Sequence, residues 1–139
     1  MAKAAGRVQP CSLAEARSRL RQAEAFVEVA EAVVVVDDDV ATPGVAAALA
    51  VLAGRAASDA ACCAKLKARP RGQNHLDAVP FLASVRPHGA EMSKNLSRLL
   101  QRKDDVHYGL SVVSAADAAK MLDWAKRIVG RAQQVLETV

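Results

Sequence analysis

The sequence is poor in aromatic residues: only 3% of its 139 residues are Phe, Trp or Tyr. Hydrophobic residues nevertheless make up 52% of the chain, and most of them are Ala, Val and Leu. Small aliphatic side chains suit close-packed helices better than a β-sandwich, and a scarcity of rings argues against binding single-stranded nucleic acid by base stacking. The length fits one domain. We therefore predict a single all-α domain with a core rich in alanine and leucine.

The sequence also lacks the strong motifs of several enzyme classes. It contains no Gly-rich phosphate loop, HExxH or GxSxG, which argues against nucleotide hydrolysis, metal-dependent hydrolysis and acyl transfer. Its three cysteines, Cys11, Cys62 and Cys63, have no CxxC spacing, and adjacent helical residues point about 100° apart. We therefore expect no metal and no cofactor. The cysteines are expected to be reduced thiols, with Cys62 and Cys63 buried as small hydrophobic side chains.

Long uncharged stretches and a signal peptide are absent as well. The longest uncharged run, residues 40–54, has 15 residues and contains Pro43 and Gly44, whereas a bilayer span needs roughly 20 apolar residues. No basic start is followed by an apolar segment of the signal-peptide type. These features predict a cytoplasmic protein that does not enter a membrane. The net charge of +4 and the pI near 9.2 are compatible with a polyanionic partner such as RNA.

Capping signals predict where the helices begin and end. Residues 1–11 show no hydrophobic period and are expected to be disordered or loosely attached, so the domain is placed at residues 12–139. "SLAE" at 12–15 and "SAAD" at 114–117 are capping boxes, and "DDD" at 37–39 opposes the helix dipole and ends the first helix. Further starts are predicted at Thr42, Asn74 and Ala90. The short connections between them predict an antiparallel bundle of four main helices with one additional short helix.

Charged residues interrupt this pattern at a few places. Asp59 falls on the apolar face of the second helix, where a carboxylate is costly unless it is paired or hydrated. Lys94, Arg98 and Arg102 recur every four residues and form a basic stripe on the fourth helix. Such a stripe can contact an RNA backbone or can simply be a solvated face, and both interpretations stay open. The loop arginines Arg69 and Arg71 could extend the stripe or cap the preceding helix.

The stretch "RKDDVH" carries the most specific chemistry. Arg102, four intervening residues and His107 resemble the Arg-x4-6-His motif of HEPN domains, which are small helical bundles. The resemblance implies a HEPN-like bundle over residues 12–137 and an RNA-binding protein, in some members a metal-independent endoribonuclease of a toxin-antitoxin or defence system. It also implies a homodimer and an antitoxin or other protein partner. Arg102 and His107 would be catalytic, and the supporting residues would be Asp59, Lys103, Asp104 and Tyr108.

The residue types suit RNA cleavage without a metal. A histidine near neutrality can accept the proton of the 2′-hydroxyl, and the arginine fork can stabilise charge on the phosphorane. A spacing of five residues places the two side chains about 140° apart on an intact helix. They therefore converge only if the helix ends between them or a second subunit takes part.

A non-catalytic helical dimerisation or protein-interaction module is the alternative. Lys103 stands where HEPN ribonucleases usually carry a small polar residue. Asp104 and Asp105 can pair with Arg102 and Lys103, and cations at a helix C-terminus complement the dipole. The unbroken apolar stripe of the first helix would then serve to pair the protein with itself or with another protein.

Overall fold

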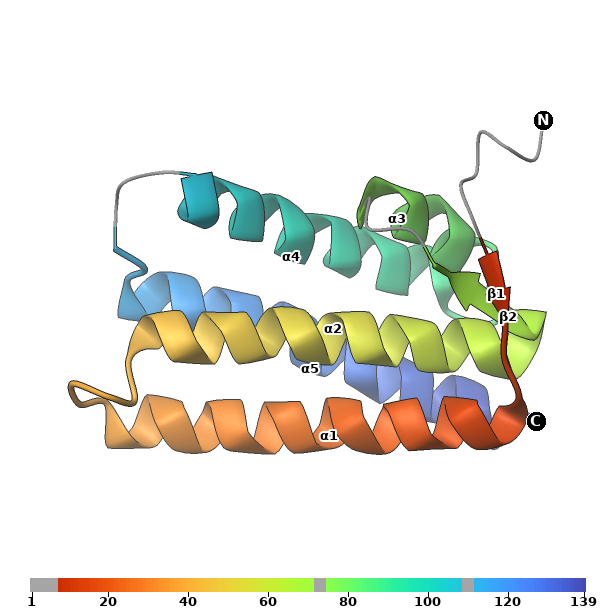
Figure 1. The fold of residues 1–139 in the computed structure, drawn as a ribbon, viewed down its shortest axis with the longest axis horizontal. Coiled ribbons are helices and arrows are strands. Elements are labelled where there is room, and N and C mark those ends of the chain that lie inside the picture. Colours follow the sequence, from red (N-terminus) through yellow and green to blue (C-terminus); the bar gives the residue numbers. More distant parts are fainter. Residues whose placement is uncertain (1–7, 72–74, 109–111) are drawn as a thin grey trace.

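The computed structural model describes residues 8–71, 75–108 and 112–139, without the side chains of residues 75, 76 and 105–108. The described chain is all-α, as predicted, with four long helices, one short helix and a small two-stranded sheet (Figure 1). The helices are α1 (Leu13–Val36), α2 (Pro43–Leu66), α3 (His75–Ala83), α4 (Gly89–Tyr108) and α5 (Ala115–Glu137), and the strands are β1 (Val8–Pro10) and β2 (Ala68–Pro70).

The capping residues begin the long helices where the sequence predicts. Ser12 and Glu15 form a reciprocal capping box at α1, with N–H···O distances of 3.1 and 2.9 Å. Thr42 and Ser114 cap α2 and α5 through their side-chain oxygens. Helix α1 ends at Val36, directly before the three aspartates, and Asp37 adopts a left-handed conformation with φ of 47°. Local hydrogen bonding therefore sets these boundaries before tertiary packing adds to them.

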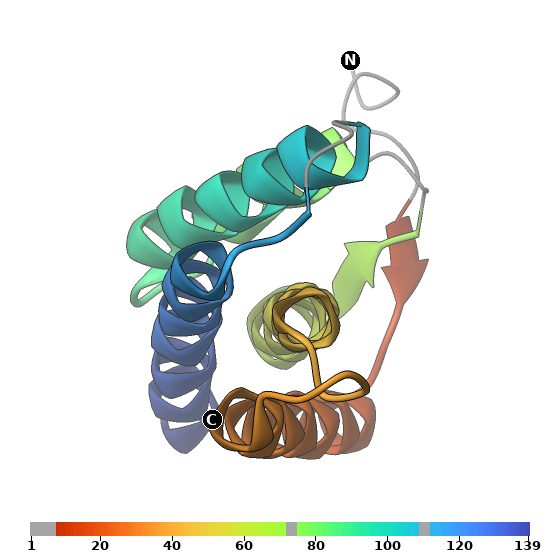
Figure 2. The same ribbon diagram turned by 90° about the vertical axis from the view of Figure 1, so that its left-hand side faces the viewer.

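Helix α2 is the centre of the bundle. Figure 2 shows it enclosed by α1, α4 and α5. It is the one described helix that is long and apolar enough to span a membrane, and 67% of its apolar window is buried inside the protein. The core helix of a bundle needs the same composition. At Gly54 a Cβ atom would lie 2.5 Å from Leu99 Cδ2, so the missing side chain lets α4 come close to α2.

The core has the predicted composition. The buried residues of α1 are all alanines, namely Ala16, Ala23 and Ala30, and alanines also dominate the buried face of α2. Larger side chains come from the other helices and fill the space that the alanines leave, and these include Leu82, Met92, Leu96, Leu99, Met121 and Ile128. Small residues on α1 and α2 let those two helices pack closely.

The prediction for the N-terminal segment is wrong over residues 8–11, whereas residues 1–7 lie outside the described part of the chain. Strand β1 pairs antiparallel with β2, with Val8 opposite Pro70. Cys11 forms a disulfide with Cys63, with S–S and Cα–Cα distances of 2.09 and 5.3 Å. Such a short strand has no hydrophobic period to reveal it, and its pairing depends on contacts across more than 50 residues.

The expectation of reduced thiols is therefore wrong for Cys11 and Cys63, because the fold brings their sulfur atoms together. Cys62 is a free, buried thiol, as predicted. Burial raises the pKa of Cys62 to about 12, and a neutral buried thiol is a poor nucleophile. Adjacent positions on one helix thus hold a disulfide sulfur and an inert thiol.

Candidate functional site

The Arg102 and His107 positions lie in the last turns of α4, which runs without a break to Tyr108. An unbroken helix places two residues five apart about 140° around its axis. The condition that the helix ends between them is therefore not met in the structure. The remaining condition is a second subunit. The side chains of His107 and Tyr108, like that of Asp105, lie outside the described residues.

Arg102 is directed toward α5. Its Nη2 atom donates to Oδ1 of Asp117, and its side chain is 38% exposed. The Arg102 Nε atom is buried without a partner among the described atoms. The hydrogen bond from Arg102 lowers the pKa of the Asp117 carboxyl below its ordinary value. The described partner of Arg102 is thus Asp117 rather than Asp104, which is exposed.

Asp117 is a residue whose contact with Arg102 sequence reasoning missed. It is recognisable in the sequence as the fourth residue of "SAAD", and its backbone N–H donates to Ser114 Oγ at 3.0 Å, as the capping pattern predicts. The carboxylate that bonds Arg102 belongs to the same residue. A capping pattern reports local backbone geometry and carries no information about a neighbouring helix.

The basic stripe on α4 is solvent-facing over most of its length. Lys94 and Arg98 are exposed, and Arg98 Nη1 lies 3.5 Å from Asn95 Oδ1. Arg71, just after β2, is exposed as well. These three cations are open to a polyanion, whereas Arg102 already has a carboxylate partner.

Asp59 is paired, which is one of the two outcomes expected for a carboxylate on an apolar face. It accepts from Arg19 Nη2 at 2.9 Å and from Arg69 Nη1 at 3.5 Å, and Gln9 accepts from Arg69 at 3.5 Å. Burial raises the pKa of the Asp59 carboxyl, while the hydrogen bond and charge of Arg19 act in the opposite direction. The pairing with two arginines occupies the carboxylate and ties β1 and β2 to the helices.

This Asp59 cluster is separate from the Arg102 site. Gly54 of α2 faces Leu99 of α4, so Asp59, five residues further along α2, lies toward the beginning of α4. The structure therefore does not bring Asp59 to Arg102, and Arg69 is bonded to Asp59 rather than aligned with the α4 stripe. The predicted support of the motif by Asp59 therefore finds no contact among the described residues.

A pocket of about 370 Å³ lies near the end of α4. It is lined mainly by aliphatic residues of α2, together with Val113 from the segment before α5 and Met121 from the second turn of α5. Two cations line it, Lys103 and Arg55. Lys103 is thus placed at a pocket wall rather than in the open. The sequence signal for Arg55 is that it stands as a lone cation within the apolar stretch of the second helix.

The fold and these sites define the protein as an all-α helical bundle with an exposed basic stripe on α4 and an apolar pocket at one end. In comparisons with known proteins, no family model, no curated protein and no solved structure matches the chain. Membership in the HEPN family stays a prediction from the Arg102 and His107 motif.

Proposed function

We propose that the protein is a HEPN-like RNA-binding homodimer that cleaves RNA without a metal at a site formed by two copies. The observation that carries the proposal is the position of Arg102 and His107 in the last turns of one unbroken helix of an all-α bundle. One chain alone cannot direct both side chains at one phosphate. Two copies related by a twofold axis can contribute one residue of each pair to a shared cleft.

The chemistry assigns a role to each residue. His107 accepts the proton of the RNA 2′-hydroxyl as the 2′-oxygen attacks the adjacent phosphorus. The bond from phosphorus to the 5′-oxygen breaks, and that oxygen takes up a proton from water, which leaves a 2′,3′-cyclic phosphate and a 5′-hydroxyl. Arg102 holds the phosphate and stabilises the charge that develops on the phosphorane. The basic residues Arg98 and Lys94, one and two turns before Arg102 on α4, attract the RNA backbone by sequence-independent charge. Arg102 exchanges Asp117 for phosphate, and the ion pair that opens is partly exposed to solvent.

The cellular setting is part of the same proposal. A ribonuclease of a toxin-antitoxin or defence system acts in the cytoplasm and is held inactive by an antitoxin or another protein. Cytoplasmic glutathione keeps most thiols reduced. The Cys11–Cys63 disulfide is therefore expected to form in such a cell only under oxidising conditions.

Cleavage of total RNA in EDTA tests the proposal. Arg102→Ala and His107→Ala should each slow cleavage by about 100-fold or more, as expected when a charge stabiliser or a general base is removed. Asp117→Asn is the matched control, because it opens the same ion pair and keeps the arginine. It should cleave at or above the wild-type rate.

A second control addresses general electrostatics. Arg98→Ala removes an exposed cation from the same helix and should weaken RNA binding and its salt dependence with little effect on the cleavage step. Equal cleavage by the wild type and by an Arg102→Ala, His107→Ala double variant would contradict the proposal that the protein cleaves RNA with these two residues.

The second candidate function is a non-catalytic helical interaction module. The contact between Arg102 and Asp117 favours it, because the guanidinium then joins α4 to α5 as a structural ion pair. In that case Asp117→Asn and Arg102→Ala should lower stability to a similar extent, and neither should change an RNA-directed activity. A comparison of these two variants therefore separates the two candidates.

A further inference from the structure

One end of the bundle carries an unusual amount of exposed apolar surface. Six of the ten exposed large hydrophobic side chains among the described residues lie there, at the end of α1, the α1–α2 connection, the start of α2 and the segment before α5. They include Val35 and Val112, which are 83% and 91% exposed. Contiguous exposed apolar surface marks a site of association in soluble proteins. This end is the one that faces the viewer in Figure 2.

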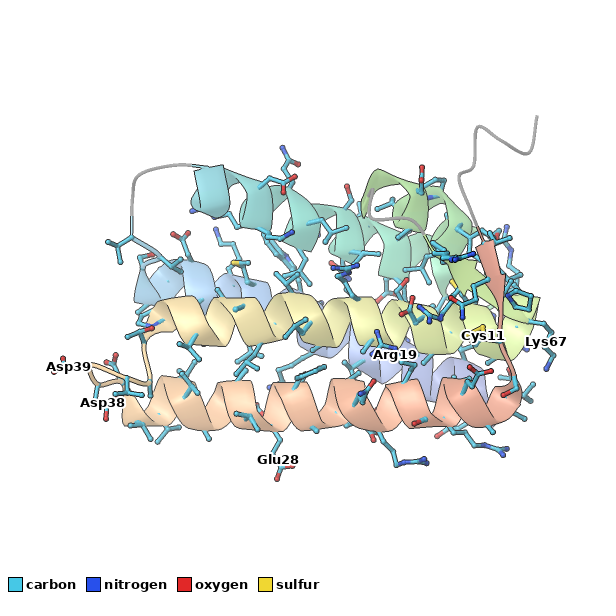
Figure 3. All side chains as sticks on the ribbon, viewed as in Figure 1. Cys11, Arg19, Glu28, Asp38, Asp39 and Lys67 are labelled. Carbon is cyan, nitrogen blue, oxygen red and sulfur yellow. A yellow bond between two sulfur atoms is a disulfide. The ribbon has the colours of Figure 1, made fainter. Side chains whose placement is uncertain are left out.

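The connection between α1 and α2 presents an apolar side chain among carboxylates. The Asp38 carboxylate accepts from the backbone N–H groups of Val40 and Ala41 at 2.9 and 2.7 Å, which fixes the shape of the turn. Val40 is 82% exposed. Asp38 and Asp39 project beyond the helix ends in Figure 3. The turn is thus a preformed projection with an acidic rim and an apolar tip.

The pocket at the same end has the complementary character. It is lined by aliphatic residues of α2, including Ala48 and Leu52, and by the exposed cation Arg55. Its volume of about 370 Å³ exceeds that of one valine side chain. The exposed Arg55 side chain lies on the same face of α2 as Ala48 and Leu52. An apolar tip with a negative rim therefore matches the pocket in both polarity and charge.

The chain itself supplies both halves of this contact. Because turn and pocket lie at one end, a twofold rotation can place the turn of each copy against the pocket of the other. Such an isologous arrangement makes the contact twice, which compensates for the small area of a single turn. It also buries the exposed valines around the turn.

We propose that two copies of this chain associate through this end, with Val40 of one copy in the pocket of the other and Asp39 beside the partner's Arg55. This inference rests on the proposed function, because a site composed of Arg102 and His107 from two copies requires a two-fold contact such as this one. Lys103, in the C-terminal part of α4, lines the pocket. Association here therefore brings the motif-bearing ends of the two α4 helices toward each other.

Light scattering and sedimentation over a range of concentrations test the contact. The wild type should dimerise, and Val40→Ser should weaken dimerisation at least about tenfold, because two valines lose their burial in each dimer. Val29→Ser is the matched control. Val29 is also an exposed valine, but it lies about two turns before the end of α1, and its replacement should leave the dimer unchanged.

A charge exchange tests the orientation. Asp39→Arg and Arg55→Glu should each weaken the dimer, since each places like charges together, and the double variant should restore it toward the wild-type affinity. Both side chains are exposed, so far-UV circular dichroism should show an unchanged fold. Failure of the double variant to restore the dimer would overturn the proposed contact.

The outcomes separate this contact from the proposed catalysis. A dimer that is insensitive to Val40→Ser and to both charge reversals overturns the contact and leaves a dimeric ribonuclease standing. A wild type that stays monomeric at all concentrations overturns the contact and the composite site together. Loss of RNA cleavage in Arg102→Ala with an intact, Val40-dependent dimer supports both proposals.

Discussion

The two ends of the bundle are built in opposite ways. At the end that carries β1 and β2, a disulfide joins Cys11 to Cys63 and Asp59 joins two arginines, so the chain is fastened to itself. At the other end the turn after α1 leaves Val40 in solvent, and a pocket lies open beside Lys103 and Arg55. The fastened end is joined by a covalent bond and by the ion pairs of Asp59, whereas the open end combines the Arg102–Asp117 ion pair with exposed apolar side chains and the exposed cation Arg55.

Among the changes that test this comparison, breaking the disulfide should have the largest effect on the unfolding free energy. Reduction removes a cross-link between residues 52 positions apart, which is worth about 4 kcal/mol in the unfolding free energy for a loop of this length. Urea unfolding with and without dithiothreitol measures the loss. Cys11→Ser should abolish the effect of the reductant.

Cys62→Ala is the matched cysteine control. The Cys62 thiol is outside the disulfide and is buried, so this variant should keep the full response to reductant. If the unfolding free energy of the wild type does not change on reduction, the disulfide does not stabilise this end of the bundle, and the proposed contrast between the two ends is wrong.

A substitution at the contact between α2 and α4, which lies between the two ends, should have the next largest effect on the unfolding free energy. Gly54→Ala places a Cβ atom against Leu99 and Ile128, and overpacking of this kind costs about 1–3 kcal/mol in the unfolding free energy. The control is Gly130→Ala in α5, where a Cβ meets nothing within 4 Å. That variant should stabilise the protein by about 0.5–1 kcal/mol through the better helix propensity of alanine. Urea unfolding of the two variants compares them, and similar effects would contradict the close approach of α2 and α4.

The pH dependence of stability should have opposite signs at the two ends. The folded-state pKa of Asp59 is raised above 3.8, so its contribution to stability falls as pH rises from 3.8 through the raised value. The folded-state pKa of Asp117 is lowered below 3.8, so its contribution is present above 3.8 and is lost as pH falls through the lowered value.

Two variants measure these signs. The difference in unfolding free energy between the wild type and Asp59→Asn should become less favourable to the wild type as pH rises above 3.8. The difference between the wild type and Asp117→Asn should become less favourable to the wild type as pH falls below 3.8. Urea unfolding at a series of pH values records both, and a common sign would contradict the assigned environments.

The smallest effect is expected from the exposed valines of the open end. Val35→Thr changes a side chain that is 83% exposed, so the unfolding free energy of the monomer should change by no more than about 0.5 kcal/mol. Thermal unfolding at low protein concentration measures it. A loss of several degrees in the unfolding temperature would show that the open end is packed within one chain.

The sequence alone predicts the long helices well. The capping patterns at Ser12, Thr42 and Ser114 and the acidic stop at Asp37 operate within a few residues, so they are visible without knowledge of the fold. The alanine-rich core is also predictable, because the period of apolar residues reports which side of each helix is buried. The position of Arg102 and His107 near a helix end follows from the same local patterns.

The sequence could not predict which charged and sulfur-containing groups meet. Arg102 contacts Asp117 and Arg19 contacts Asp59 across helix boundaries, and the strand at residues 8–10 pairs with a segment 60 residues away. No local pattern distinguishes Cys62 from its neighbour Cys63. Cys63 forms the disulfide and Cys62 does not, because the two side chains point in different directions from the helix and only that of Cys63 reaches Cys11.

The all-α class, the helix boundaries and the small-residue core follow from the sequence alone, since hydrogen-bonded caps and hydrophobic periodicity act over one to four residues. The disulfide, the ion-pair partners and the pocket between α2, α4 and α5 depend on the tertiary structure. These features depend on the relative placement of helices, which is set by the packing of Gly54, the alanines and the larger side chains opposite them.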